Sequence, residues 1–163
     1  MNGLHQRVRK TLERHALCPA GARLLVGLSG GSDSVALVFL LHDLAENGGF
    51  SIAGLAHLNH ALRPSADRDE AFCRALAGRL NFRILVETAD VKGYARARNL
   101  SIEDAARRIR YDFMERAADT LGADGIAVGH TQDDQAETFL LKLMRGAGLT
   151  GLAGIYPRRG RVI

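Results

Sequence analysis

Residues 22–41 decide the fold, and they read Ala22-Arg-Leu-Leu-Val-Gly-Leu-Ser-Gly-Gly-Ser-Asp-Ser-Val-Ala-Leu-Val-Phe-Leu-Leu41. The first seven residues are almost entirely apolar, which is typical of a strand buried on both faces of a parallel sheet. A glycine-rich turn follows at 29–34. The apolar run 35–41 then predicts a central helix that is apolar all round and ends near residues 47–49. This order of strand, turn and helix is the first unit of an α/β domain.

The same unit recurs along the rest of the chain, after an amphipathic helix over residues 4–17. The pattern of residues 89–100 favours neither helix nor strand. On the long helix predicted over 102–121, one apolar stripe contains Ile102, Ala106, Ile109, Phe113 and Ala117. The remaining predicted elements are strands at 52–58, 82–87 and 125–129 and helices at 67–80 and 132–145.

This alternation predicts a doubly wound parallel sheet with helices on both faces, of the Rossmann-like class. Ligands bind such sheets outside the carboxyl ends of the strands. The turns at 29–34, 57–63 and 129–134 follow three of the predicted strands, so we expect the site there. Residues 146–163 hold five glycines and end as a strand cut off in mid-course. We therefore expect one domain over 1–163 that is part of a longer protein.

The composition excludes several classes of protein. A chain of 163 residues that is 47% hydrophobic is long enough for one globular core. No apolar run reaches the roughly 18 residues of a membrane span, so we expect no membrane partner. Cys18 and Cys73 form neither a CxxC pair nor a zinc pattern. Reduced thiols in the cytoplasm are the expected state.

Arginine dominates the basic residues, since only Lys10, Lys92 and Lys142 among the 22 Lys and Arg are lysines. Arginine offers a planar fork of donors that matches phosphate, which favours a nucleotide or nucleic-acid partner. Codon bias in a GC-rich genome gives the same composition without any functional message. Both interpretations remain open on composition alone.

The turn Ser29-Gly30-Gly31-Ser32-Asp33-Ser34 is the strongest local signal in the chain. Adjacent glycines let backbone N–H groups point at an anion, and the N-terminus of the following helix adds its dipole. The serine hydroxyls of the turn add further hydrogen-bond donors. Asp33 repels phosphate unless a cation lies between them, so we predict that Asp33 binds Mg²⁺ bridged to a pyrophosphate group.

The turn has two other possible interpretations. It could be a plain connection with a Ser or Asp N-cap. Gly27, Ser29 and Gly31 also match the nucleophile elbow GxSxG of hydrolases, which would need a later Asp and His as partners. Two adjacent glycines followed by Ser-Asp-Ser fit a pyrophosphate loop better than either.

The turn resembles the pyrophosphate loop of the N-type ATP pyrophosphatases, the PP-loop superfamily. The resemblance implies an adenine nucleotide alpha hydrolase-like fold and cleavage of ATP between its α and β phosphates. Residues 29–34 are then the ATP-binding residues, and the cofactors are ATP and Mg²⁺.

Three further segments narrow the resemblance to the tRNA(Ile)-lysidine synthetases over nearly the whole chain. They are His57-Leu-Asn-His-Ala-Leu-Arg63, Asp104-Ala-Ala-Arg-Arg-Ile-Arg-Tyr111 and Gly129-His-Thr-Gln-Asp-Asp-Gln-Ala-Glu-Thr138. That family joins free L-lysine to the wobble cytidine of tRNA(Ile) with a CAU anticodon. The resemblance implies that His57, Asn59, His60 and Arg63 line the nucleotide and substrate pocket. Longer members carry C-terminal domains that help to hold tRNA, so this chain is expected to be the catalytic domain alone.

The residue spacing also supports a site on the long helix. A turn of 100° per residue places Arg107 and Arg110 about 60° apart on one flank, with Glu103 and Tyr111 near them and Arg108 opposite. Glu103 would orient Arg107 at i,i+4. A solvated helix face is the alternative explanation of this pattern.

Two residues near the next predicted helix complete the candidate site. His130 just precedes that helix, and Thr131 with Asp134 resembles a capping box. A His and a carboxylate this close could position metal, substrate or a proton, although a structural His is the alternative. Zinc at His57 and His60 is not expected, because no third ligand stands nearby in sequence. We predict Asp33, Arg107, Arg110, His130 and Asp134 as the catalytic residues.

Two rival functions remain open. A sibling tRNA enzyme that thiolates cytidine shares the loop, but such enzymes rely on paired cysteines. A non-catalytic nucleotide-binding module would keep the glycines without needing Asp33 or the two arginines.

Overall fold

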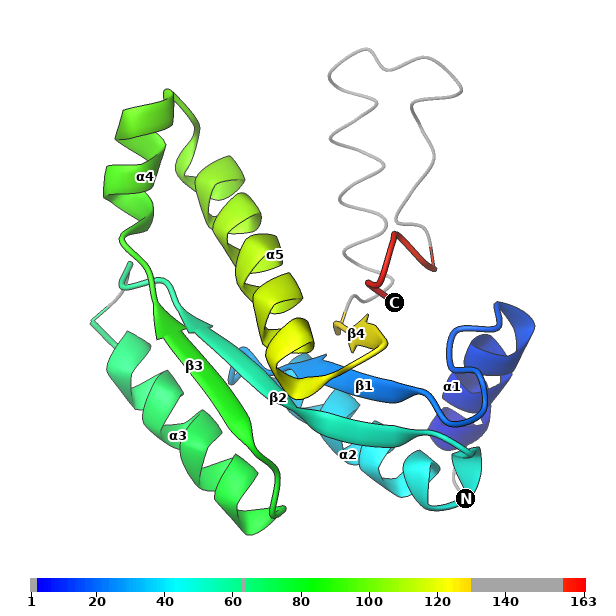
Figure 1. Ribbon diagram of the computed structural model, residues 1–163. Helices are drawn as coiled ribbons and strands as arrows, with labels where there is room; N and C mark the ends of the chain where they lie inside the picture. Colours follow the sequence, from blue (N-terminus) through cyan, green and yellow to red (C-terminus); the bar gives the residue numbers. More distant parts are fainter. Residues whose placement is uncertain (1–2, 63, 130–156) are drawn as a thin grey trace.

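The computed structural model describes residues 3–62, 64–129 and 157–163. The alternation of strands and helices predicted over residues 4–129 is confirmed (Figure 1). The helix predicted over 132–145 lies outside the described residues. The elements are α1 (Gly3–Arg14), β1 (Arg23–Gly27), α2 (Ser32–Gly48), β2 (Ser51–Asn59), α3 (Ala66–Arg79), β3 (Ile84–Thr88), α4 (Val91–Arg98), α5 (Ile102–Leu121) and β4 (Gly125–Ala127).

The strands form one parallel sheet in the order β3-β2-β1-β4. The chain leaves β1 toward β2 on one side and returns from β3 to β4 on the other, so the winding direction reverses between β1 and β4. Helices α2 and α3 pack against one face of the sheet, and α5 packs against the other. This is the predicted doubly wound architecture. A crevice at such a switch point is where these sheets bind ligands.

Strand β1 is buried on both faces, as its apolar sequence predicts. Leu24, Leu25 and Val26 are each at most 1% exposed. Leu24 and Val26 pack in the cluster that contains α2 and α3, whereas Leu25 packs in the cluster that contains α5. Alternate side chains of one strand therefore join the two layers of the core.

Helix α2 is not buried on all sides, so the prediction of a central helix was wrong. Its buried apolar residues are Val38, Leu41 and Leu44, which face the sheet. Phe39 on another side is 41% exposed. The helix is buried only where the sheet covers it, because α2 belongs to an outer layer of the domain.

The apolar stripe predicted on α5 holds only for its second half. Ile102 is 43% exposed, and Ala106 and Ile109 are partly buried. The first half of α5 instead packs through Ala105 against Val91 and Ala95 of α4. The pattern of residues 89–100 favours neither helix nor strand, so it does not predict α4, the helix that packs against this half of α5. The buried residues of α5 are Ala105, Phe113, Met114, Ala117, Ala118 and Leu121.

The last residues of the chain extend the sheet beyond β4. The Ile126 N–H donates to the Arg161 carbonyl at 2.8 Å, and the Ile163 N–H donates to the Ile126 carbonyl at 2.8 Å. Val162 and Ile126 form a parallel bridge. In place of the strand expected at the end of the chain, the described residues 157–163 form an isolated parallel bridge to β4.

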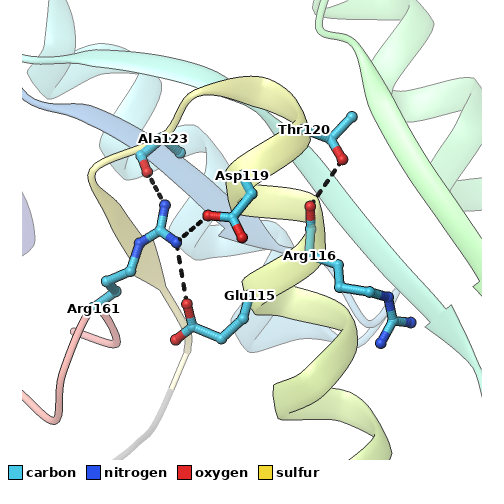
Figure 2. Close-up of polar contacts among 6 residues, drawn as sticks. All are labelled: Glu115, Arg116, Asp119, Thr120, Ala123 and Arg161. Carbon is cyan, nitrogen blue, oxygen red and sulfur yellow. Dashed lines mark hydrogen bonds and ion pairs between the residues drawn. The ribbon is translucent and has the colours of Figure 1, made fainter.

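Arg161 ties this terminal segment to the end of α5 (Figure 2). Its Nη1 lies 2.6 Å from Asp119 Oδ1 and 3.2 Å from Glu115 Oε2. Its Nη2 donates to the Ala123 carbonyl in the turn that leads into β4. One guanidinium group therefore connects three parts of the fold: the helix, the turn and the terminal segment.

We expect Arg161→Ala to lower the free energy of unfolding by about 1–2 kcal/mol, because several partly exposed charge-assisted bonds are lost together. Urea denaturation monitored by circular dichroism measures this change. Arg159→Ala is the matched control, since Arg159 is exposed and adjacent in the same turn. Equal effects of the two substitutions would contradict the role of Arg161.

Candidate functional site

A cavity of about 680 Å³ opens at the carboxyl edge of the sheet. Its volume lies within the range of small-molecule sites. Segments far apart in the sequence meet there: the turn after β1, the end of β2 and one flank of α5. The predicted site residues that line it are Ser29, Gly31, Ser32, Asp33, Ser34, His57, Asn59, His60, Arg107 and Arg110.

The turn 29–34 presents an uncapped helix N-terminus to this cavity. The N-cap of α2 is Gly31, so no N-cap side chain bonds to the first turn of the helix. The interpretation of the turn as a Ser or Asp cap was therefore wrong. Free N–H groups at a helix start, together with the helix dipole, favour an anion such as phosphate.

Ser34 shapes the loop from within. It is 7% exposed, and its hydroxyl donates to the Gly31 carbonyl at 2.9 Å. The same oxygen accepts from the Ser29 backbone N–H at 3.1 Å and from the Ser29 hydroxyl at 3.0 Å. This hydroxyl closes the turn by joining its beginning to its end, which leaves backbone N–H groups as the outward donors.

We expect Ser34→Ala to weaken nucleotide binding by about tenfold and to destabilise the protein by about 1–2 kcal/mol, because Ser29 and Gly31 lose a buried partner. Calorimetric titration with ATP and thermal unfolding measure the two effects. Ser34→Thr keeps the hydroxyl and serves as the control. Wild-type ATP affinity in Ser34→Ala would show that the hydroxyl does not hold the loop.

Two glycines allow neighbouring segments to approach the loop. Gly30 has φ +88°, and a Cβ there would lie 3.4 Å from the Cys73 Sγ. Gly129, just after β4, would place a Cβ 3.3 Å from the Asp33 carbonyl oxygen. The loop is thus close to α3 on one side and to the end of β4 on the other. The positive φ disfavours a side chain at Gly30, and the close Asp33 backbone disfavours one at Gly129.

The carbonyl of Leu28, directly before the loop, accepts from two buried side chains. The Nδ1 of His57 lies 2.8 Å from it, and the Sγ of Cys73 lies 3.7 Å from it. Burial, with smaller contributions from Asp69 and Glu70, raises the pKa of the Cys73 thiol to about 11, so the thiol keeps its proton and donates. The sequence pattern does not connect Cys73 with the loop, because nothing in the spacing of α3 indicates which residue faces the loop.

Asn59 anchors α3 to the end of β2. Its side-chain amide donates to Asp67 at 3.2 Å and to Glu70 at 3.1 Å, and its carbonyl oxygen accepts from the Ala61 N–H at 2.9 Å. All three bonds are internal to the protein. Asn59 lines the cavity as predicted, but its polar atoms are already used to hold the wall in place.

His60 is half-buried beside the arginines of α5. Burial lowers the pKa of His60, and the positive charge of Arg110 and the ring of His57 lower it further. The imidazole is therefore held in its neutral form. Its Nδ1 is buried and has no hydrogen-bond partner within the described part of the chain.

Arg107, Arg110 and Tyr111 form the α5 wall of the cavity, as the helical spacing predicts. The guanidinium carbons of the two arginines lie 5.6 and 5.8 Å from the Tyr111 ring centroid. Glu103 also lines the cavity, yet no hydrogen bond or ion pair joins it to Arg107, so the predicted orienting pair was wrong. The Tyr111 ring, rather than a carboxylate, is the neighbour of both guanidinium groups.

Arg108 points away from this cavity. It lines a separate cavity of about 590 Å³, together with Tyr94, Asp112 and Arg159. Arg107 and Tyr111 border both cavities. The prediction that Arg108 lies off the nucleotide side of α5 is confirmed.

Arg63, His130 and Asp134 lie outside the described residues, and their predicted roles stay predictions. Among the described residues, no group of three or more His, Cys, Asp or Glu side chains could hold a metal ion. Asp33 is exposed in the first turn of α2, where its carboxylate accepts from the Ser32 hydroxyl at 3.3 Å. One carboxylate beside a phosphate site fits Mg²⁺, which commonly uses one or two carboxylates plus phosphate oxygens.

The chain is similar to curated proteins that modify tRNA. It is 43% identical over 161 residues to the tRNA(Ile)-lysidine synthase of Dehalococcoides mccartyi, a match that covers 98% of this chain and 34% of that protein. It is 42% identical over 161 residues to the tRNA(Ile)-lysidine synthase of Bacteroides thetaiotaomicron, covering 98% of this chain and 37% of that protein. The chain thus spans about a third of the length of these relatives.

A solved structure has the same fold at low sequence identity. The U34-tRNA thiolase NcsA from Methanococcus maripaludis, solved with its iron–sulfur cluster, superposes with a TM-score of 0.74. The identity is 20%, and the match covers 90% of this chain and 49% of that one. This likeness supports the fold class alone.

No helix within the described ranges is long and apolar enough to cross a membrane. A family model described as a PP-loop domain matches residues 3–162. That range contains the uncapped glycine loop after β1 and the whole wall of the cavity it faces. The chain therefore belongs to the PP-loop domain family.

Proposed function

We propose that this chain is the catalytic domain of an enzyme that uses ATP to join free L-lysine to C2 of the wobble cytidine in tRNA(Ile) with a CAU anticodon. The observation that carries this proposal is the uncapped glycine loop facing Arg107 and Arg110 across one cavity. The similarity to the tRNA(Ile)-lysidine synthases named above supports the same substrate class.

The reaction we propose has two steps. The C2 carbonyl oxygen of the cytidine bonds to the α-phosphorus of ATP, and the bond to the bridging oxygen breaks, so that pyrophosphate leaves with the electron pair. The amine of lysine then bonds to C2 and loses a proton, while the C2–O bond breaks and AMP leaves. No oxidant or reductant is required.

The described residues suit the negative charge that develops on the phosphate groups in these two steps. The backbone of the loop and the N-terminus of α2 would bind the leaving pyrophosphate. Arg107 and Arg110 would stabilise negative charge on the transferring phosphoryl group. Asp33 would hold Mg²⁺, which neutralises phosphate charge when it is bound. His130 and Asp134, by resemblance, would complete the site.

Cytidine thiolation is the second candidate, and the cysteines argue against it. Cys73 is buried against the carboxyl end of β1, whereas Cys18 lies in the connection before the amino end of β1. Both are free thiols. Two cysteines at opposite ends of a strand cannot cooperate in sulfur transfer. We propose that the protein acts in the cytoplasm, where thiols stay reduced and where its tRNA substrate is modified.

The test is ATP–pyrophosphate exchange in the presence of the tRNA(Ile) transcript. We expect exchange that depends on the tRNA and disappears when the wobble cytidine is replaced by uridine. Exchange without any tRNA would favour a different adenylated substrate. Absence of ATP binding would reduce the chain to a domain that shares only the fold.

We further propose that residues 1–163 form one catalytic domain and that tRNA-binding domains lie outside it. The chain is then expected to bind ATP at micromolar concentration or tighter, yet to modify tRNA poorly. Affinity for tRNA depends on many phosphate contacts, and losing about 3 kcal/mol of them weakens binding roughly a hundredfold. Comparing the Dehalococcoides mccartyi relative with its own matching segment, at low tRNA concentration, measures this loss. Equal turnover would show that the catalytic domain suffices.

A further inference from the structure

His57 has an imidazole ring whose two nitrogens differ in their surroundings. The residue is 3% exposed near the end of β2 and lines the cavity beside the loop. Its Nδ1 lies 2.8 Å from the Leu28 carbonyl oxygen. A carbonyl oxygen can only accept, so Nδ1 must carry the hydrogen.

This bond determines what the other nitrogen can do. A neutral imidazole that is protonated on Nδ1 has a lone pair on Nε2, so Nε2 is an acceptor. The Leu28 carbonyl therefore selects a single tautomer of His57.

The Nε2 of His57 is buried and has no hydrogen-bond partner among the residues that the structure describes. Buried polar atoms are nearly always paired, and an unpaired one at a cavity wall is a mark of a missing ligand. The side chain of the neighbouring Asn59 is not available to bind a ligand, because its polar atoms are bound to Asp67, Glu70 and Ala61. The wall therefore offers one acceptor of defined tautomer beside the loop.

We propose that His57 Nε2 accepts a hydrogen bond from the nucleoside part of the nucleotide bound in this cavity. Leu28, which holds the ring, directly precedes the loop, so a nucleotide with its phosphates in the loop has its nucleoside close to this wall. The donor is an N–H or O–H group, either the amino group of the base or a ribose hydroxyl. This inference rests on the proposed function, because it takes ATP as the ligand.

The test combines one substitution with three ATP analogues in calorimetric titrations. His57→Asn keeps a donor at the position of Nδ1 and removes the acceptor at Nε2. The analogues are 2′-deoxy-ATP, 3′-deoxy-ATP and ITP, which lack the two hydroxyls and the amino group in turn. We expect one analogue to bind the wild-type protein about tenfold more weakly than ATP. His57→Asn should bind ATP and that analogue equally, and it should bind inorganic pyrophosphate like the wild type.

The outcomes separate this inference from the proposed function. If the wild-type protein does not bind ATP, the proposed function fails and the inference fails with it. If ATP binds but all analogues bind equally well, or if discrimination persists in His57→Asn, only the inference is overturned. Nitrogen-15 spectra of the wild-type histidines keep the test independent of the variant's folding. The Nε2 resonance should be that of an unprotonated nitrogen and should move when ATP is added, and an unchanged resonance would overturn the inference.

Discussion

Asp33→Asn is expected to remove the magnesium dependence of nucleotide binding while the protein stays folded. In the presence of Mg²⁺ we expect the affinity for ATP to fall about a hundredfold, equivalent to about 3 kcal/mol. Asp33 is exposed beside the uncapped N-terminus of α2, and its carboxylate contacts the Ser32 hydroxyl in the described structure. An anion in a phosphate site is favourable only when a cation lies between the two.

The same reasoning predicts an inversion when the metal is removed. With a chelator present, Asp33 repels the phosphates directly, so Asp33→Asn should bind ATP more tightly than the wild-type protein does. Calorimetric titrations with and without Mg²⁺ measure both effects. Glu46→Gln removes the same charge from an exposed position further along α2 and is the matched control. A variant that keeps the wild-type response to Mg²⁺ would refute the role of Asp33.

Arg110→Ala is expected to weaken ATP binding by about 10- to 100-fold. Arg110 lines the cavity opposite the loop and lies close enough to His60 to lower the pKa of that histidine. A guanidinium group in this position can form two parallel bonds to a phosphate, which are about twice as strong as neutral hydrogen bonds. Arg107→Ala should have a similar effect, because Arg107 lies beside the same Tyr111 ring.

Arg108→Ala is the matched control for this pair, since it removes the same group from the same helix. Arg108 lines the other cavity, so we expect its ATP affinity to stay within about twofold of wild type. The salt dependence of tRNA binding should fall in each variant that loses a phosphate contact. Equal losses of ATP affinity in all three variants would show that the wrong face of α5 has been assigned to the site.

Local sequence determined the strand β1, the glycine loop and the start of α2. The burial of Leu24, Leu25 and Val26 follows from an uninterrupted apolar run, and the positive φ of Gly30 follows from the one residue type that adopts it freely. The helical period was likewise sufficient to place Arg107 and Arg110 on one flank of α5. These features depend on neighbours within a few residues in the chain, so the sequence pattern contains the information.

Tertiary structure alone decided how the loop is supported and which partners the helices find. The bonds from His57 and Cys73 to the Leu28 carbonyl join residues 29 and 45 positions apart, and the contact of Arg161 with Asp119 spans 42. Ile102 is exposed at the start of α5, although Ala105, one turn further on, packs against Val91 and Ala95 of α4. Such contacts depend on how whole elements pack in three dimensions, and spacing along the chain does not encode which buried donor meets which carbonyl.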